Sequence, residues 1–241
     1  MQLEGKRVLI VGGSSGIGYA VAEAAIAGGA RVTIASSHAK RVEAATQKLG
    51  ERAAAYPLDV RDEAQVSAYF DQLTEPLDHV ISTAGDWGGS MRNRLAELDL
   101  AAASRIFDVR FWGALALAKH AARKLVPNGS ITFTGGMVAH RPMKGTNVAT
   151  AMAGGLEHLT RALAVELAPI RVNAVCPGLI RTGIWNAIPE ERREQEFTRM
   201  TSTQLVPRIG EPAECAQAYE YLMKCGFVTG QVLYVDGGTR G

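Results

Sequence analysis

Short apolar runs alternate with longer amphipathic stretches along this 241-residue chain. The runs have the length of buried strands, and in the stretches between them the hydrophobic residues recur at helical spacing. The pattern predicts strands at about residues 7–12, 31–36, 53–60, 77–85, 129–136, 170–178 and 231–238. It predicts helices at about residues 16–29, 39–50, 63–73, 99–125 and 149–167.

Repeated strand–helix units of this kind are typical of a parallel sheet with helices on both faces. Because such connections are right-handed, about seven strands in this arrangement form a doubly wound α/β sheet. Neither a linker nor a low-complexity tract interrupts the alternation, so we expect one domain over residues 1–241.

The composition excludes several classes of function. Hydrophobic residues make up 47% and charged residues 21%, and the formal net charge of +2 gives no strong attraction to nucleic acid or to a membrane. The three cysteines form no CxxC pair, which favours a cytoplasmic protein without disulfides. The five histidines show no metal-ligand spacing, so no metal site is predicted. No apolar run is long enough to span a bilayer.

A glycine-rich turn, VGGSSGIGYAV, lies between the first strand and the first helix. Gly12 permits a tight turn, Gly16 lets the backbone approach a pyrophosphate, and Gly18 lets the helix and the strand pack closely. The N–H groups at the start of the helix then face the phosphates, aided by the helix dipole. This position in the chain predicts a dinucleotide site.

The end of the second strand decides which dinucleotide is expected. An acidic residue there would accept a hydrogen bond from the ribose of NAD, but the chain has Ser36, Ser37 and His38. Lys40 and Arg41 follow closely. Hydroxyls and cations can bind a 2′-phosphate, which favours NADP(H) over NAD(H); the alternative is a solvated strand end.

Several motifs together resemble the short-chain dehydrogenase/reductase family over nearly the whole chain. Its glycine loop appears as VGGSSGIG with Val11 in place of Thr, its adenine-binding pair as Asp59 and Val60, and its Asn-Asn-Ala-Gly turn as STAG at residues 82–85. Its Pro-Gly-x-x-x-Thr segment is intact at residues 177–182. The resemblance implies a Rossmann fold and a cofactor site formed by Gly12, Ser14, Ser15, Gly16, Ile17, Gly18, Ser36, Ser37, His38, Asp59, Val60, Ala84, Gly85, Pro177, Gly178, Ile180 and Thr182.

The catalytic residues that the resemblance implies are absent. The family uses an Asn, a Ser and a Tyr-x-x-x-Lys pair, and the matching positions here hold Arg110, Gly136, Ala149 and Ala153. We expect nothing in residues 147–157, NVATAMAGGLE, to move a proton well. General acid–base catalysis typically accelerates a reaction by about 10²- to 10⁴-fold, so loss of the whole acid–base unit usually removes most of the rate of a step that needs proton transfer.

Two hypotheses follow for function. The first is an NADP(H)-binding protein without ordinary catalysis, either a cofactor sensor or a non-catalytic partner. The second is an NADPH-dependent oxidoreductase acting on a small carbonyl or alcohol, with His140 as a relocated proton donor. Arg110 is either an oxyanion-stabilising group or one half of a structural ion pair. His140, Arg141 and Lys144 can equally be exposed loop residues.

Three further expectations concern packing and assembly. The volume lost at the bare positions is collapsed, refilled by Met137 or Met152, or occupied by a ligand. Residues 180–206 match the family's mobile substrate lid, with Trp185 and Phe197 as apolar anchors. The apolar faces of residues 100–125 and 148–168 predict a homodimer or homotetramer.

Overall fold

Seven parallel strands form one sheet in the computed structural model, which describes residues 3–85 and 94–239. The strand order is β3-β2-β1-β4-β5-β6-β7, and every neighbouring pair is parallel. The strands are β1 (Arg7–Val11), β2 (Arg31–Ser36), β3 (Ala53–Pro57), β4 (Leu77–Ser82), β5 (Leu125–Thr134), β6 (Arg171–Pro177) and β7 (Val232–Val235). This confirms the doubly wound α/β fold predicted from the hydrophobic pattern.

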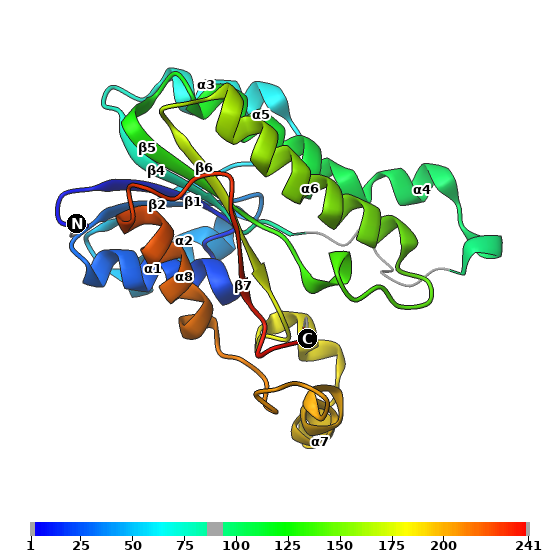
Figure 1. Cartoon of the computed structure of the whole chain (residues 1–241). Helices are drawn as coiled ribbons and strands as arrows, with labels where there is room; N and C mark the ends of the chain where they lie inside the picture. Colours follow the sequence, from blue (N-terminus) through cyan, green and yellow to red (C-terminus); the bar gives the residue numbers. More distant parts are fainter. Residues whose placement is uncertain (1–2, 86–93, 240–241) are drawn as a thin grey trace.

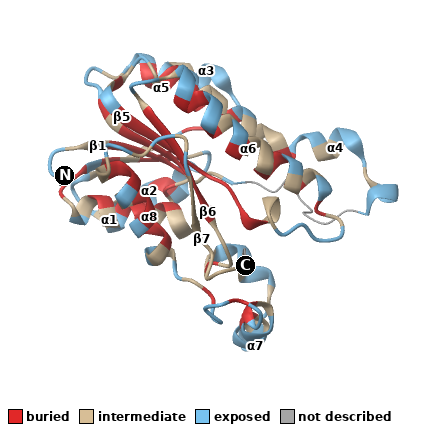
Figure 2. Ribbon diagram, in the orientation of Figure 1, coloured by how far each residue is buried: buried red, intermediate tan, exposed pale blue. Residues whose placement is uncertain are grey.

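Helices cover both faces of the sheet (Figure 1). One face packs against α1 (Gly16–Ala27), α2 (Ala39–Leu49) and α8 (Pro212–Lys224). The other packs against α3 (Glu63–Asp71), α5 (Gly113–Ala121) and α6 (Asn147–Glu166). The strands lie in the buried interior between the two helix layers (Figure 2). Burial on both faces explains why the strands have near-continuous apolar sequences rather than alternating ones.

The remaining helical elements lie in the segments of chain that follow β4, β5 and β6. They are η1 (Leu95–Glu97), α4 (Leu100–Ser104), η2 (Asp108–Trp112), η3 (Met137–Ala139), η4 (Gly183–Ala187) and α7 (Glu190–Thr201). The last two belong to the predicted lid, and α7 stands well away from the sheet (Figure 1). Every helix within the described ranges is too short or too polar to cross a lipid bilayer.

Several predicted boundaries were wrong. The helix expected over residues 99–125 is divided into α4, the π-helical η2 and α5, and it ends at Ala121. Leu125 instead begins β5, four residues before the predicted strand, where it pairs with Leu77. The register between β4 and β5 then shifts, because Asn128 adopts a positive φ of 65° in a segment whose sequence, PNG, is typical of a turn. The third and fourth strands also end earlier than predicted, at Pro57 and Ser82.

The direction of the strand order reverses between β1 and β4, which are neighbours in the sheet. In a doubly wound sheet, ligands bind at the carboxyl ends of the strands beside such a reversal. The loops after β1 and β4 therefore border the expected binding crevice.

Candidate active site

The glycine turn after β1 packs tightly against the end of β4. Gly12 has a φ of 88°, and a Cβ there would lie 2.5 Å from the backbone nitrogen of Ala84. At Gly18, a Cβ would lie 2.3 Å from Thr83 Oγ1. Both backbone N–H groups of residues 83 and 84 donate to the carbonyl oxygen of Val11, at 2.8 and 3.1 Å. The turn geometry assigned to Gly12 and the close packing assigned to Gly18 are therefore both present.

The start of α1 has the features that a bound phosphate needs. Gly16 has a φ of 54°, and a Cβ there would lie 3.2 Å from Thr182 Cγ2, so the glycine turn faces the segment after β6. Among the helices that the structure describes, the side chains of Asp62 and Asp99 accept hydrogen bonds from the first N–H groups of α3 and α4, whereas the side chain of Ser15 makes no such bond at α1. The first N–H groups of α1 are thus left for an anion, and the residues fit a dinucleotide pyrophosphate.

The predicted adenosine-binding residues lie where β2 and β3 finish side by side, since Leu58 N donates to the Ser36 carbonyl at 3.0 Å. Ser36 Oγ accepts from the backbone N–H of His38 at 3.3 Å, and Ser37 Oγ lies 3.2 Å from His38 Nδ1. These three predicted residues therefore form one polar strand end, which is half-buried at Ser36 and exposed at Ser37 and His38.

Arg61 lies against Asp59 in the segment after β3, although the sequence analysis did not single it out. Its guanidinium pairs with Asp59 at 2.6 Å, and its side-chain hydrogen bonds lower the pKa of the Asp59 carboxyl. The side chain of Val60 is buried and packs against Gly113 on α5. Any contact that Val60 makes with a ligand would come from its main chain.

The segment after β6 lies on the opposite side of the crevice from the adenosine end. Gly178 N donates to the Val235 carbonyl at 2.9 Å, and a Cβ on Gly178 would lie 2.7 Å from Asp236 Cα. Ile180 is buried and forms a β-bridge with Gly210. These contacts fix the backbone of the predicted nicotinamide-binding segment, residues 177–182.

Arg110 connects the ends of β4 and β5. It lies in the π-helical η2, an irregularity that often occurs at functional sites. Its Nη1 donates to the carbonyl oxygens of Thr134 and Gly135 at 3.3 and 3.4 Å, and its guanidinium lies against Gly85. The half-buried charge is thus directed at the crevice, between the predicted cofactor-binding turn and Gly136.

Apolar side chains surround the positions that the family would fill with Tyr and Lys. Ala149 and Ala153 are both buried. Ala149 packs in a small cluster with Ile106 and Met152, and Phe107 and Phe111 pack against this cluster. Of the alternatives predicted for the lost volume, refilling by Met152 is the one that this packing supports.

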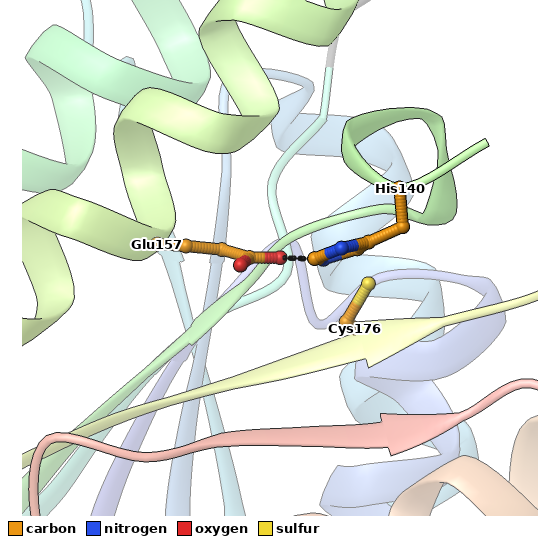
Figure 3. A group of neighbouring side chains, drawn as sticks. All are labelled: His140, Glu157 and Cys176. Atoms are coloured by element: carbon orange, nitrogen blue, oxygen red, sulfur yellow. Dashed lines mark hydrogen bonds and ion pairs between the residues drawn. The ribbon is translucent and has the colours of Figure 1, made fainter. Parts of the chain in front are cut away.

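His140 is not an exposed loop residue. Its Nε2 lies 2.7 Å from Glu157 Oε1 (Figure 3). The same nitrogen lies 3.0 Å from the hydroxyl of Tyr234, and the imidazole packs edge-on against the tyrosine ring. Glu157 is only 4% exposed, so its carboxylate is held against the imidazole away from water. Arg141 and Lys144, by contrast, are exposed as predicted.

The expectation that residues 147–157 hold no proton-handling group was wrong at Glu157. This residue follows Ala149 and Ala153 at intervals of four, so all three lie on one face of α6. Cys176, at the end of β6, completes a group with His140 and Glu157 in which the ligand atoms all lie within 4.8 Å of one another. The missed signal was an acidic residue on the apolar face of an amphipathic helix.

In the segment predicted as a lid, the two predicted anchors pack against each other. Phe197 is buried, and Trp185 packs edge-on against it at 5.9 Å between ring centroids. Arg181 lies over the Phe197 ring and pairs with Glu194. A cleft of about 420 Å³ opens between α1 and this segment, with Gly16 and Thr182 on its wall.

Comparison with known proteins gives consistent matches over the full chain. A family model described as "Enoyl-(Acyl carrier protein) reductase" matches residues 11–240. Short-chain dehydrogenase/reductase ATR9 of Stachybotrys chlorohalonatus is 38% identical, covering 98% of this chain and 97% of its own length.

Solved structures agree with the sequence matches. The MalC reductase/Diels-Alderase of Malbranchea aurantiaca superposes with a TM-score of 0.91 at 30% identity, covering 98% of this chain and 96% of its own. A small-chain dehydrogenase in complex with NADPH superposes with a TM-score of 0.82 at 34% identity, covering 98% of each chain.

Proposed function

The chain belongs to the short-chain dehydrogenase/reductase family, and from that premise we propose that it is an NADPH-dependent reductase of a small carbonyl compound in which His140 supplies the proton. The observation that carries the proposal is the 2.7 Å contact between His140 Nε2 and the buried carboxylate of Glu157. A carboxylate in that position fixes the orientation of the imidazole ring.

Binding of a nicotinamide dinucleotide is supported by the NADPH complex of the similar small-chain dehydrogenase and by the glycine turn. The preference for the phosphorylated form is part of the proposal. It is supported by the hydroxyls of Ser36 and Ser37, by His38, and by Arg61, which pairs with Asp59 after β3, the strand beside β2. Hydroxyl and cationic donors suit a 2′-phosphate, which carries about two negative charges.

The reaction requires a hydride and a proton. The bound NADPH would supply the hydride to the carbonyl carbon. Glu157 engages Nε2 of His140, so Nδ1 is the nitrogen that would give its proton to the substrate oxygen, and the imidazole would be reprotonated from water. Arg110 would stabilise negative charge as it develops on that oxygen, because its guanidinium reaches the ends of β4 and β5.

A binding titration followed by a turnover screen tests the proposal. Calorimetry is expected to show NADPH binding at least severalfold tighter than NADH. A panel of small ketones and aldehydes is then screened for oxidation of NADPH. Turnover of any substrate at a rate above that without protein supports a reductase. Tight NADPH binding without turnover across the panel would favour the cofactor sensor or non-catalytic partner instead.

A second candidate function is catalysis of a cycloaddition. It is favoured by the likeness to MalC, which is described as both a reductase and a Diels-Alderase, and by Gly136, Ala149 and Ala153. A cycloaddition forms carbon–carbon bonds without transfer of a hydride or a proton, so it needs none of the missing groups. Product formed from a diene-containing substrate without consumption of NADPH would identify this activity.

A further inference from the structure

We propose that His140, Glu157 and Cys176 form a binding site for a divalent transition metal ion of the zinc type. One imidazole nitrogen, one carboxylate oxygen and one sulfur lie within 4.8 Å of one another. Figure 3 shows the side chains converging from the loop after β5, from α6 and from β6.

The set of donor atoms indicates which ions suit the site. Imidazole, thiolate and carboxylate are all ligands of Zn²⁺, whereas Mg²⁺ and Ca²⁺ prefer oxygen donors alone. Three protein ligands leave a fourth tetrahedral position for water, as in zinc sites that remain open. The group therefore fits zinc or cobalt better than an alkaline-earth ion.

The surroundings hold the ligands in place and limit access of water. Cys176 is fully buried and its sulfur lies 3.6 Å from Met137 Sδ. The imidazole, with its side chain 22% exposed, is the ligand through which an ion would enter. The hydroxyl of Tyr234 lies beside the same nitrogen, where it would act as a partner outside the ligand set.

Metal binding needs a small movement of His140. Its Nε2 and Glu157 Oε1 are now bonded to each other at 2.7 Å. Two donors about 2.0 Å from a tetrahedral ion lie about 3.3 Å apart, so the imidazole nitrogen and the carboxylate oxygen must separate by about 0.6 Å. A thiolate about 2.3 Å from the same ion lies about 3.5 Å from each of these atoms, so the sulfur, which lies within 4.8 Å of both, must adjust as well. His140 follows the short turn η3, and a shift of this size is compatible with a loop position.

Occupation of the site would remove His140 from proton transfer. Zinc would thus inhibit the reductase, a consequence that rests on the proposed function. Metal binding itself does not rest on it, since it depends only on the three side chains.

The test uses Co²⁺ as an optical probe on the full-length protein. Stoichiometric Co²⁺ is expected to give thiolate-to-cobalt charge-transfer absorption and the visible bands of a tetrahedral ion, and Zn²⁺ is expected to displace it. Cys176→Ser should abolish the charge-transfer absorption, while the matched control Cys225→Ser, at a more accessible free cysteine, should retain it. Glu157→Gln, a conservative change, should weaken binding by about tenfold or more.

The outcomes separate the two proposals. Absence of the charge-transfer absorption in the wild-type protein, its persistence in Cys176→Ser, or its loss in Cys225→Ser would each overturn the metal site. Binding of Co²⁺ by a protein that shows no reductase turnover would support the site and count only against the proposed function. Binding accompanied by zinc inhibition of turnover would support both.

Discussion

Replacement of Ser36 by Asp is expected to reverse the choice of cofactor. Ser36 is half-buried at the end of β2, and its hydroxyl already accepts a hydrogen bond from His38. A carboxylate can accept the same bond, so the local backbone should be retained. The new charge would, however, lie beside the position proposed for the 2′-phosphate of NADPH.

The size of the effect follows from the environment of the strand end. Two unit charges 4 Å apart repel by about 1 kcal/mol in water and by about 4 kcal/mol at an effective dielectric constant of 20. The strand end is partly solvated, and the solvent screens the new charge. We therefore expect a loss of about 1.5 to 3 kcal/mol, or roughly tenfold to 150-fold in the Kd for NADPH.

Calorimetric titration of NADPH and NADH against the wild-type protein, Ser36→Asp and Ser36→Ala measures this effect. Ser36→Ala should lose only one hydrogen bond, about 0.5 to 1.5 kcal/mol. Ser36→Asp should bind NADH at least as tightly as the wild type does. An unchanged Kd for NADPH in Ser36→Asp would show that the 2′-phosphate does not bind at this strand end.

The remaining predictions concern stability and assembly. Burial holds the pKa of His79 at about 4, below the ordinary 6.5, so the unfolded chain binds a proton that the folded chain does not between these values. The free energy of unfolding should therefore fall by up to about 3 kcal/mol as the pH drops from 6.5 to 4. Urea denaturation at a series of pH values should show a smaller fall for His79→Asn than for the wild type, and an equal fall in the two proteins would contradict this. Gly18→Ala would place a methyl group 2.3 Å from Thr83 Oγ1, which should lower the free energy of unfolding by about 1 to 3 kcal/mol. Thermal unfolding should therefore show a lower Tm, and an unchanged Tm would refute the packing argument. Because Trp112 is 57% exposed on one of the apolar faces predicted to associate, light scattering at micromolar concentration should give a dimer or tetramer, and a monomeric mass would exclude this assembly.

The fold could be predicted because buried parallel strands leave a strong local pattern. Each strand is an apolar run bounded by turn residues, and the runs are separated by helices of ordinary length. The prediction failed around Leu125, where the chain pairs with β4, makes a turn through Asn128 and then pairs again. Local sequence shows the turn, but it does not show that pairing begins before it.

The candidate site likewise has parts that could be predicted from the sequence and parts that could not. The glycine turn and the strand end at Ser36 are contiguous in sequence, so their geometry could be predicted. The contact of His140 with Glu157 spans 17 residues, and Cys176 comes from a different strand. Only the packing of α6 against the sheet brings these side chains together, which is why each one alone resembled an ordinary loop, helix or strand residue.

Loss of the His140 side chain tests the central claim most directly. The rate of NADPH oxidation is compared between the wild type, His140→Ala and the control His158→Ala, with the Kd for NADPH measured for each. His158 is a suitable control because it lies exposed on α6, next to Glu157. The account predicts that His140→Ala lowers kcat/KM by about 10²- to 10⁴-fold with the Kd unchanged, while His158→Ala has no effect. Turnover at the wild-type rate in His140→Ala would contradict it.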